Sequence, residues 1–242
     1  MNSNSKQVSI SGNPELVASR RHTIILTAVL LAIAVWGLIF QFGSGENAAT
    51  EVSHQDRMTL FVSALAAEWG LFVYVWRVGL RRHGTRLRNL IGGRWGGWHA
   101  VLRDLALAAL IWLAWLGLEH GWDLWLGPGE ARSIGAYLPR GIVETVLWIA
   151  VSMSAGFCEE ITFRGYFQQQ FAALTGHRFA GVLLQALLFG VIHCYQGFVA
   201  CIKITLFGLM YGALAAWRGS LRPGIAAHAW TDLWAGWLSA IL

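Results

Sequence analysis

Two adjacent acidic residues, Glu159 and Glu160, lie at the end of an apolar stretch long enough to cross a membrane. Arg164 follows Glu160 by four residues, so on a helix these two side chains share a face and form an ion pair. Glu159 lies about 100° round the helix from Glu160 and points elsewhere. The spacing therefore predicts one structural carboxylate, held by Arg164, and one free carboxylate that is available for proton transfer.

Two further pairs of residues share this spacing. Phe189 precedes His193 by four residues, and His228 precedes Asp232 by four. Ionisable residues inside membrane spans are costly and mark functional sites. Each group also has a structural explanation, namely a helix-end ion pair, a core histidine bonded to a carbonyl, or a helix-packing hydrogen bond. Taken together, two carboxylates, an arginine, two histidines and an aspartate are the ingredients of a hydrolytic site.

The elements that position these residues are expected to be membrane helices. The chain is 56% hydrophobic and only 13% charged, with a mean hydropathy of +0.51, which is not typical of a soluble domain. A membrane span needs about 20 apolar residues. The runs that approach this length are Thr23–Phe42, Met58–Trp76, Val101–Leu118, Gly141–Phe163, Phe179–Tyr195, Phe198–Trp217 and Pro223–Leu242. We therefore expect an all-α, polytopic transmembrane helix bundle with about seven spans, within a range of six to eight.

Charge distribution predicts the orientation. Most of the eighteen Lys and Arg lie at the N-terminus or in loops on the same side, so this side is expected to be cytoplasmic. We expect a polar cytoplasmic tail over 1–22, no cleavable signal, and a single transmembrane domain over 23–242. The net charge of +5 then reflects topology and contact with the lipid bilayer, not nucleic-acid binding. These features favour an integral protein of a bacterial inner (plasma) membrane.

The three cysteines, Cys158, Cys194 and Cys201, are odd in number and lie in or beside apolar segments. We interpret them as small apolar residues and not as a disulfide framework. A cysteine nucleophile is an alternative, because Cys158 adjoins Glu159 and Cys194 adjoins His193. Sequence neighbours on a helix point about 100° apart, so such a pair would have to arise across helices.

Other charged residues lie inside predicted spans and suggest a different class of function. Glu68, Glu144 and Lys203 could belong to the path of a small membrane transporter. Inverted repeats or paired helices broken by Gly and Pro would favour that alternative, and neither is visible. We expect Glu144 to lie near the outer surface, and Lys203 to reach the interface or to pair with a carboxylate.

Three motifs occur in the order typical of a known family. EExxxR begins at Glu159, FxxxH ends at His193, and HxxxN begins at His228 with Asp232 in place of the Asn. In these motifs the chain resembles the CPBP family, which comprises intramembrane CAAX prenyl endopeptidases of the Ras-converting type and the Abi proteins. The resemblance covers about 140–242, which would be the catalytic core of the transmembrane domain.

The resemblance implies a glutamate-dependent endopeptidase that hydrolyses a peptide bond of a membrane-associated protein or peptide. Glu159 would be the general base, because a carboxylate in a poorly hydrated pocket takes up a proton more readily than one in water. His193 would hold the water or the peptide carbonyl, and His228 and Asp232 would orient the water or stabilise the oxyanion. The supporting residues would be Glu160, Arg164 and Phe189.

Several alternatives stay open. The set Glu159, His193, His228 and Asp232 contains plausible zinc ligands, so a metal-assisted mechanism is possible, although the spacing is not HExxH. The substrate could be a prenylated CAAX tail, a bacteriocin leader or a sorting-signal tail. A catalytically silent immunity or scaffold protein of the same family is the main alternative function. Oligomeric state is not indicated.

The depth of the site raises a conflict. Glu159 is expected near the cytoplasmic end of its helix, whereas His193 follows Phe179 by a distance of about 21 Å along an upright helix. To bring them together, we expect an interfacial amphipathic helix at 164–178 and a fifth span that is strongly tilted or begins deeper. A water-filled cavity open to the cytoplasm would then reach toward the middle of the membrane.

Overall fold

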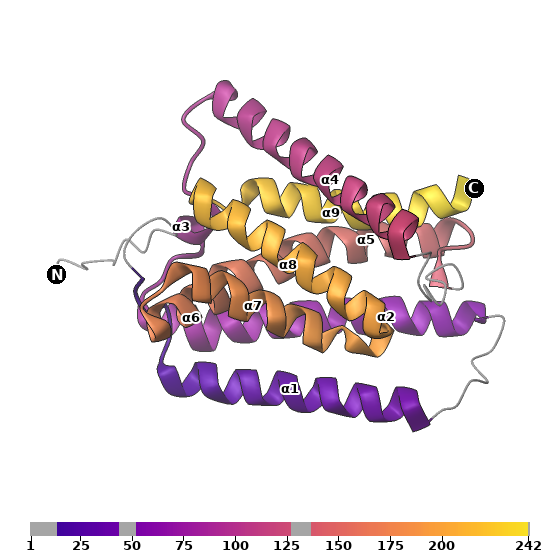
Figure 1. Cartoon of the computed structure of the whole chain (residues 1–242), viewed down its shortest axis with the longest axis horizontal. Helices are drawn as coiled ribbons and strands as arrows, with labels where there is room; N and C mark the ends of the chain where they lie inside the picture. The colour runs from indigo at the N-terminus through magenta and orange to yellow at the C-terminus, as the bar shows by residue number, and fades with distance from the viewer. Residues whose placement is uncertain (1–13, 44–51, 127–136, 242) are drawn as a thin grey trace.

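The computed structural model describes residues 14–43, 52–126 and 137–241, and every regular element in these ranges is a helix. The long helices lie side by side along the long axis of the molecule, with α1 (Arg20–Gly43) and α4 (Trp98–Leu126) at opposite margins (Figure 1). The predicted all-α bundle is confirmed.

The helices of the described residues fall into two halves along the chain. The first half continues after α1 with α2 (His54–Tyr74), the π-helix η1 (Val75–Leu80), the short 3-10 helix η2 (Arg81–His83), α3 (Leu87–Ile91) and α4. The second half comprises α5 (Ile142–Glu159), the π-helix η4 (Glu160–Phe167), α6 (Gln168–Thr175), α7 (Arg178–Ile192), the 3-10 helix η5 (Cys194–Gln196), α8 (Phe198–Arg218) and α9 (Arg222–Ile241). Within the described residues, each of the seven predicted apolar runs coincides largely with one helix or with two consecutive helices of this series.

Five helical segments of the described chain are long and apolar enough to cross a membrane. They are Arg20–Ile39, His54–His83, Trp98–Trp125, Ile142–Thr175 and Phe198–Arg218. The apolar helix α7 is shorter, and α9 supplies the last predicted span with 20 residues. Together these seven elements agree with the predicted count of about seven. The protein is an integral membrane protein.

The expectation of a separate amphipathic helix over 164–178 needs correction. Helical structure continues without a break from Ile142 to Thr175, through η4 and α6. Arg164 and Gln168 are buried inside the bundle instead of facing lipid headgroups. The physical reason is that these polar side chains find partners within the protein: Arg164 pairs with Glu160, and Gln168 donates a hydrogen bond to the carbonyl of Gly212.

Part of the segment that precedes the first span is held by contacts inside the bundle. Residues 1–13 lie outside the described residues, but Val17 and Ala18 are fully buried. Both backbone N–H groups donate to the side-chain oxygen of Gln170, at 2.7 and 3.0 Å. This contact ties the segment before α1 to α6, so a buried glutamine explains why the chain is fixed ahead of the first span.

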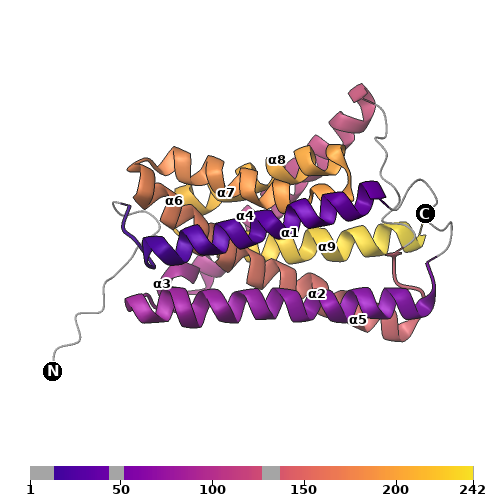
Figure 2. The same cartoon turned by 90° about the horizontal axis from the view of Figure 1, so that it is seen from below.

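Helix α5 occupies the middle of the bundle. It packs against α2 on one side and α9 on the other, while α6, α7 and α8 form a second group of neighbours (Figure 2). The contact between α5 and α9 is close because small residues face each other. A Cβ added to Gly156 would lie 2.7 Å from the backbone nitrogen of Ala229. Small residues at such crossings let membrane helices approach closely.

Candidate active site

Glu160 is the buried centre of the candidate site. Its carboxylate lies 3.1 Å from Arg164 Nη1, and both side chains are fully buried. The same carboxylate oxygen lies 3.0 Å from His228 Nδ1, which reaches it from α9. Gly224 leaves the space for this approach, because a Cβ at that position would lie 2.8 Å from Glu160 Oε2. The ion pair predicted from the i, i+4 spacing is therefore present, and it also anchors the histidine.

His228 presents its other ring nitrogen to two further acids. Its Nε2 lies 3.7 Å from a carboxylate oxygen of Glu159 and 3.6 Å from one of Asp232. The side chain of Glu159 is 21% exposed and that of Asp232 is 35% exposed, whereas Glu160 is fully buried. The side chain of Glu159 is therefore partly exposed and that of Glu160 is not. This difference is what the prediction of one free and one structural carboxylate requires.

The tautomer of His228 follows from its partners. A carboxylate accepts and cannot donate, so the Nδ1 nitrogen carries the hydrogen that bonds to Glu160. In the neutral ring Nε2 is then an acceptor, and in the protonated ring it is a donor aimed at Glu159 and Asp232. Glu160 therefore fixes the orientation of the imidazole that faces the free carboxylate.

His193 joins the site through an aromatic ring. Its Nδ1 donates to the backbone carbonyl of Phe189 at 2.7 Å, which leaves Nε2 as an acceptor in the neutral ring. The ring of Phe189 lies 4.8 Å from that of His193 and 6.3 Å from that of His228. The Arg164 guanidinium lies 4.5 Å from the centre of the same ring. Phe189 thus connects the two histidines and packs on the cation that holds Glu160.

The expected conflict of depth does not arise. Because the helix that carries Glu159 continues to Thr175, this residue lies near the middle of a 34-residue helical segment. The turn at Gly176 then starts α7, and His193 lies at its far end, a similar number of residues from the turn. The antiparallel arrangement of the two helices therefore brings both residues to a similar level along the bundle.

The site is also lined by aromatic residues that the sequence did not indicate. The rings of Phe207 and Tyr211 lie 4.9 and 5.9 Å from His228. Tyr195 stacks 6.2 Å from His193 and interacts electrostatically with Glu159. Each aromatic lies on an ordinary apolar stretch, so no motif marks it. The short distance of Tyr195 from His193 along the chain is the one signal that could have pointed to it.

The interpretation of the cysteines is wrong in part. Cys194 and Cys201 form a disulfide that joins η5 to the first turn of α8, next to His193. Cys158 is free and buried, as expected for a small apolar residue. The pairing was not predictable from the odd count, because the sequence does not show that a turn at Gly197 brings the other two sulfurs together.

Two of the other embedded charges, Lys203 and Glu144, have local partners. Lys203 pairs with Asp123 at 3.0 Å, which confirms the expected carboxylate partner. Glu144 lies in the first turn of α5 and is fully buried beside Arg57. A carboxylate that is matched by a neighbouring guanidinium needs no solute path to explain it.

The described residues contain no group of three or more His, Cys, Asp and Glu arranged as ligands of a metal ion. Nε2 of His228 lies near carboxylate oxygens of Glu159 and Asp232, while its Nδ1 bonds to Glu160. These side chains offer a partly exposed carboxylate, two oriented imidazoles and a buried ion pair, which suit acid–base activation of water.

Comparison with known proteins identifies the part of the chain that carries this site. Residues 141–234 match the family model described as type II CAAX prenyl endopeptidase Rce1-like. The match spans α5 to most of α9 and so contains the residues of all three motifs. No curated protein and no solved structure matches the chain.

Proposed function

We propose that the chain is an intramembrane endopeptidase in which Glu159 activates water, a proposal supported by the match of residues 141–234 to the Rce1-like CAAX prenyl endopeptidase family and by the helices long enough to cross a membrane. The observation that carries the proposal is the arrangement around His228. One ring nitrogen is held by the buried Glu160, and the other faces the partly exposed Glu159 at 3.7 Å.

In the proposed reaction Glu159 takes a proton from a water molecule while the water oxygen forms a bond to the peptide carbonyl carbon. The proton then passes to the amine nitrogen as the C–N bond breaks, which leaves a carboxylic acid and an amine. The water would also donate to Nε2 of neutral His193, because that nitrogen accepts when Nδ1 bonds to the carbonyl of Phe189. The acceptor nitrogen favours a role for His193 in holding the water over a role in polarising the peptide carbonyl.

The negative charge that develops on the carbonyl oxygen needs a donor. His228 supplies one when its Nε2 is protonated, and the carboxylates of Glu160 and Asp232 balance the charge of the ring. Arg164 in turn balances Glu160 and keeps it in place. Asp232 would act as the second wall of the site, in the position where the family motif has Asn.

The substrate is proposed as a protein or peptide in the membrane of a bacterial cell, with the N-terminus of the enzyme in the cytoplasm. A prenylated CAAX tail agrees with the description of the matched family. A bacteriocin leader and a sorting-signal tail are the other candidates. All three present an extended segment beside a lipid-embedded anchor.

The experiment compares the wild-type protein with Glu159→Gln, both in lipid nanodiscs, on membrane-embedded peptides of the three classes. Mass spectrometry identifies new termini. We expect cleavage by the wild type and none by the variant. Equal cleavage by both would remove Glu159 from the mechanism, and no cleavage of any class by the wild type would favour the silent immunity or scaffold function. A parallel series with a chelator tests zinc, since loss of wild-type activity would show a metal requirement.

A further inference from the structure

A group of arginines surrounds a single carboxylate at the end of the bundle where α4 and α9 begin and α8 ends (Figure 1). The carboxylate belongs to Asp104 on α4, which is buried. Arg103, Arg218 and Arg222 lie at 3.9, 2.8 and 3.6 Å from its oxygens. Among the described residues, no other carboxylate lies within salt-bridge distance of these three guanidinium groups. Three positive charges therefore face one negative charge.

Two of the three arginines are held in place by the protein. Arg218 donates from Nε and Nη2 to Asp104 Oδ1, at 3.0 and 2.8 Å. Arg222 donates to the backbone carbonyl of Gly92 at 2.7 Å, and its guanidinium lies 4.4 Å from the ring centre of Trp95. Trp95 in turn donates to Asp104 Oδ2 at 3.0 Å. Both carboxylate oxygens thus accept hydrogen bonds, and the two arginines have defined positions.

Arg103 differs from the other two arginines. Its Nε lies 3.9 Å from Asp104 Oδ1, which is too long for a hydrogen bond, and its side chain is 58% exposed. It follows the first residue of the span Trp98–Trp125 by five residues, which corresponds to about 8 Å along the helix axis. A cation inside a membrane span is costly unless an anion balances it. The described part of the chain offers Arg103 no carboxylate that is not already engaged, so the anion must come from outside.

Exposed tryptophans indicate the depth of this arginine cluster in the membrane. Trp95, Trp98 and Trp217 come from three different segments, and each is at least half exposed. Tryptophan is enriched at the level of the lipid headgroups. Arg218, next to Trp217, is also the last residue of the span Phe198–Arg218. Arginine side chains near the end of a span extend toward the headgroup layer. The cluster therefore lies at the depth of the lipid phosphates.

The surrounding sequence adds to the positive charge at this end of the bundle. Residues 75–103 contain seven arginines and no acidic residue. Such a surface attracts anionic lipid, and a guanidinium group binds phosphate oxygens in a matched planar geometry. Charge alone would give a diffuse attraction. The two fixed arginines beside Arg103 provide a defined place for one anion.

We propose that Arg103, Arg218 and Arg222 bind the phosphate headgroup of one anionic phospholipid. Arg103 donates to the phosphate oxygens, and the two fixed arginines supply the remaining attraction. The lipid joins α4 to the end of α8 and the start of α9, so it stabilises the folded bundle. The inference is independent of the proposed peptidase function, since no residue of the candidate active site takes part.

The binding test uses the full chain in detergent after copurified lipid has been removed, and native mass spectrometry gives the Kd of phosphatidylglycerol. Phosphatidylcholine carries the phosphate without a net charge, and inorganic phosphate carries the anion without acyl chains. We expect phosphatidylglycerol to bind about tenfold or more tightly than phosphatidylcholine. A millimolar excess of inorganic phosphate should not displace it. Equal binding of the two lipids, or displacement by inorganic phosphate, would overturn the proposal.

Substitutions separate a defined site from a diffuse basic surface. Arg103→Gln should weaken phosphatidylglycerol binding about fivefold, which is the contribution of one arginine near anionic headgroups, and Arg103→Lys should recover part of it. Arg82→Gln is the control, because Arg82 is exposed on η2 at the other margin of the bundle. There Gly79, three residues earlier, packs against His22 of α1. The control should bind within about twofold of the wild type. No loss in Arg103→Gln, or an equal loss in Arg82→Gln, would refute the site.

Thermal unfolding in nanodiscs gives a second measurement. A larger share of phosphatidylglycerol should raise the Tm of the wild type and of Arg82→Gln more than that of Arg103→Gln, because a ligand that binds the folded state stabilises it. The same rise in all three proteins would contradict a specific lipid site at Arg103.

Discussion

Removal of the buried cation at Arg164 tests the electrostatic core of the site. Arg164→Met keeps an apolar chain of similar length but leaves the fully buried Glu160 with His228 as its remaining charged partner. Breaking a buried ion pair by removing one member costs about 3–5 kcal/mol. The variant also loses the contact of the guanidinium with the ring of Phe189, at 4.5 Å. We therefore expect the free energy of unfolding to fall by about 3–5 kcal/mol.

The assay is reversible unfolding in mixed detergent micelles, followed by tryptophan fluorescence. Arg94→Met is the control, because this arginine is exposed and its loss should cost less than about 0.5 kcal/mol. Glu160→Gln combined with Arg164→Met removes both charges, so the double variant should be about 2 kcal/mol more stable than the sum of the single effects predicts. Additive effects, or a loss below about 1 kcal/mol for Arg164→Met, would refute the ion-pair reasoning.

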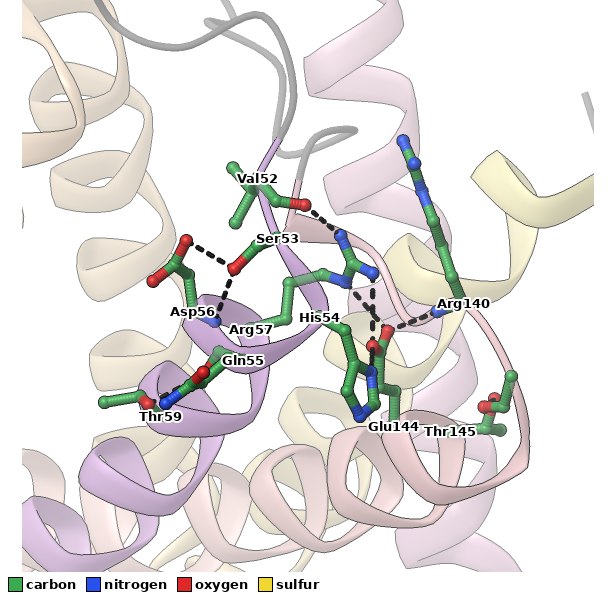
Figure 3. Close-up of polar contacts among 11 residues, drawn as sticks. Val52, Ser53, His54, Gln55, Asp56, Arg57, Thr59, Arg140, Glu144 and Thr145 are labelled. Carbon is green, nitrogen blue, oxygen red and sulfur yellow. Dashed lines mark hydrogen bonds and ion pairs between the residues drawn. The ribbon is translucent and has the colours of Figure 1, made fainter.

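Three further substitutions test other parts of the account. Gly156→Ala should lower the free energy of unfolding by about 1–3 kcal/mol and also lower kcat, because its methyl group would push α9 away from α5. Gly117→Ala, with open space around it, should change neither quantity in the unfolding and cleavage assays. Cys158→Ser should keep kcat within about threefold of the wild type, and a loss of a hundredfold would instead favour a cysteine nucleophile. Glu144→Gln should lower the free energy of unfolding by about 3–5 kcal/mol and also reduce cleavage, because it breaks the ion pair with Arg57 that joins α2 to α5 (Figure 3). Unchanged stability would contradict this role of the ion pair.

Local spacing predicted the contacts that lie on one helix. Glu160 with Arg164 and His228 with Asp232 are both i, i+4 pairs, and both lie close in the structure. The apolar runs predicted the spans for the same reason, because length and hydropathy are properties of a continuous segment.

Contacts between different helices could not be predicted from spacing along the chain. No pattern in the sequence indicates that His228 Nδ1 reaches Glu160, or that α2 packs on α5 with Arg57 beside Glu144. Both depend on helix packing, which follows from the fit of many side chains. The π-helix that starts at Glu160 was equally invisible, since its residues have no distinct composition.

The misplaced helix over 164–178 has an instructive cause. The helix was expected at the membrane interface in order to bring Glu159 and His193 to the same depth, but Gln168 donates to Gly212 and Gln170 accepts from Val17 and Ala18 inside the bundle. Polar residues therefore marked an internal contact and not an interface. Sequence alone does not distinguish the two.

The most direct test of the central claim asks whether Glu159 and His228 act on the same water. The measurement is kcat for Glu159→Gln, His228→Asn and the double variant, with folding checked by circular dichroism. We expect each single change to lower kcat by about 10²–10⁴-fold, and the double variant to be no slower than the slower single, because residues that act as a unit are not additive. Losses that multiply in the double variant, or wild-type kcat in Glu159→Gln, would contradict the account.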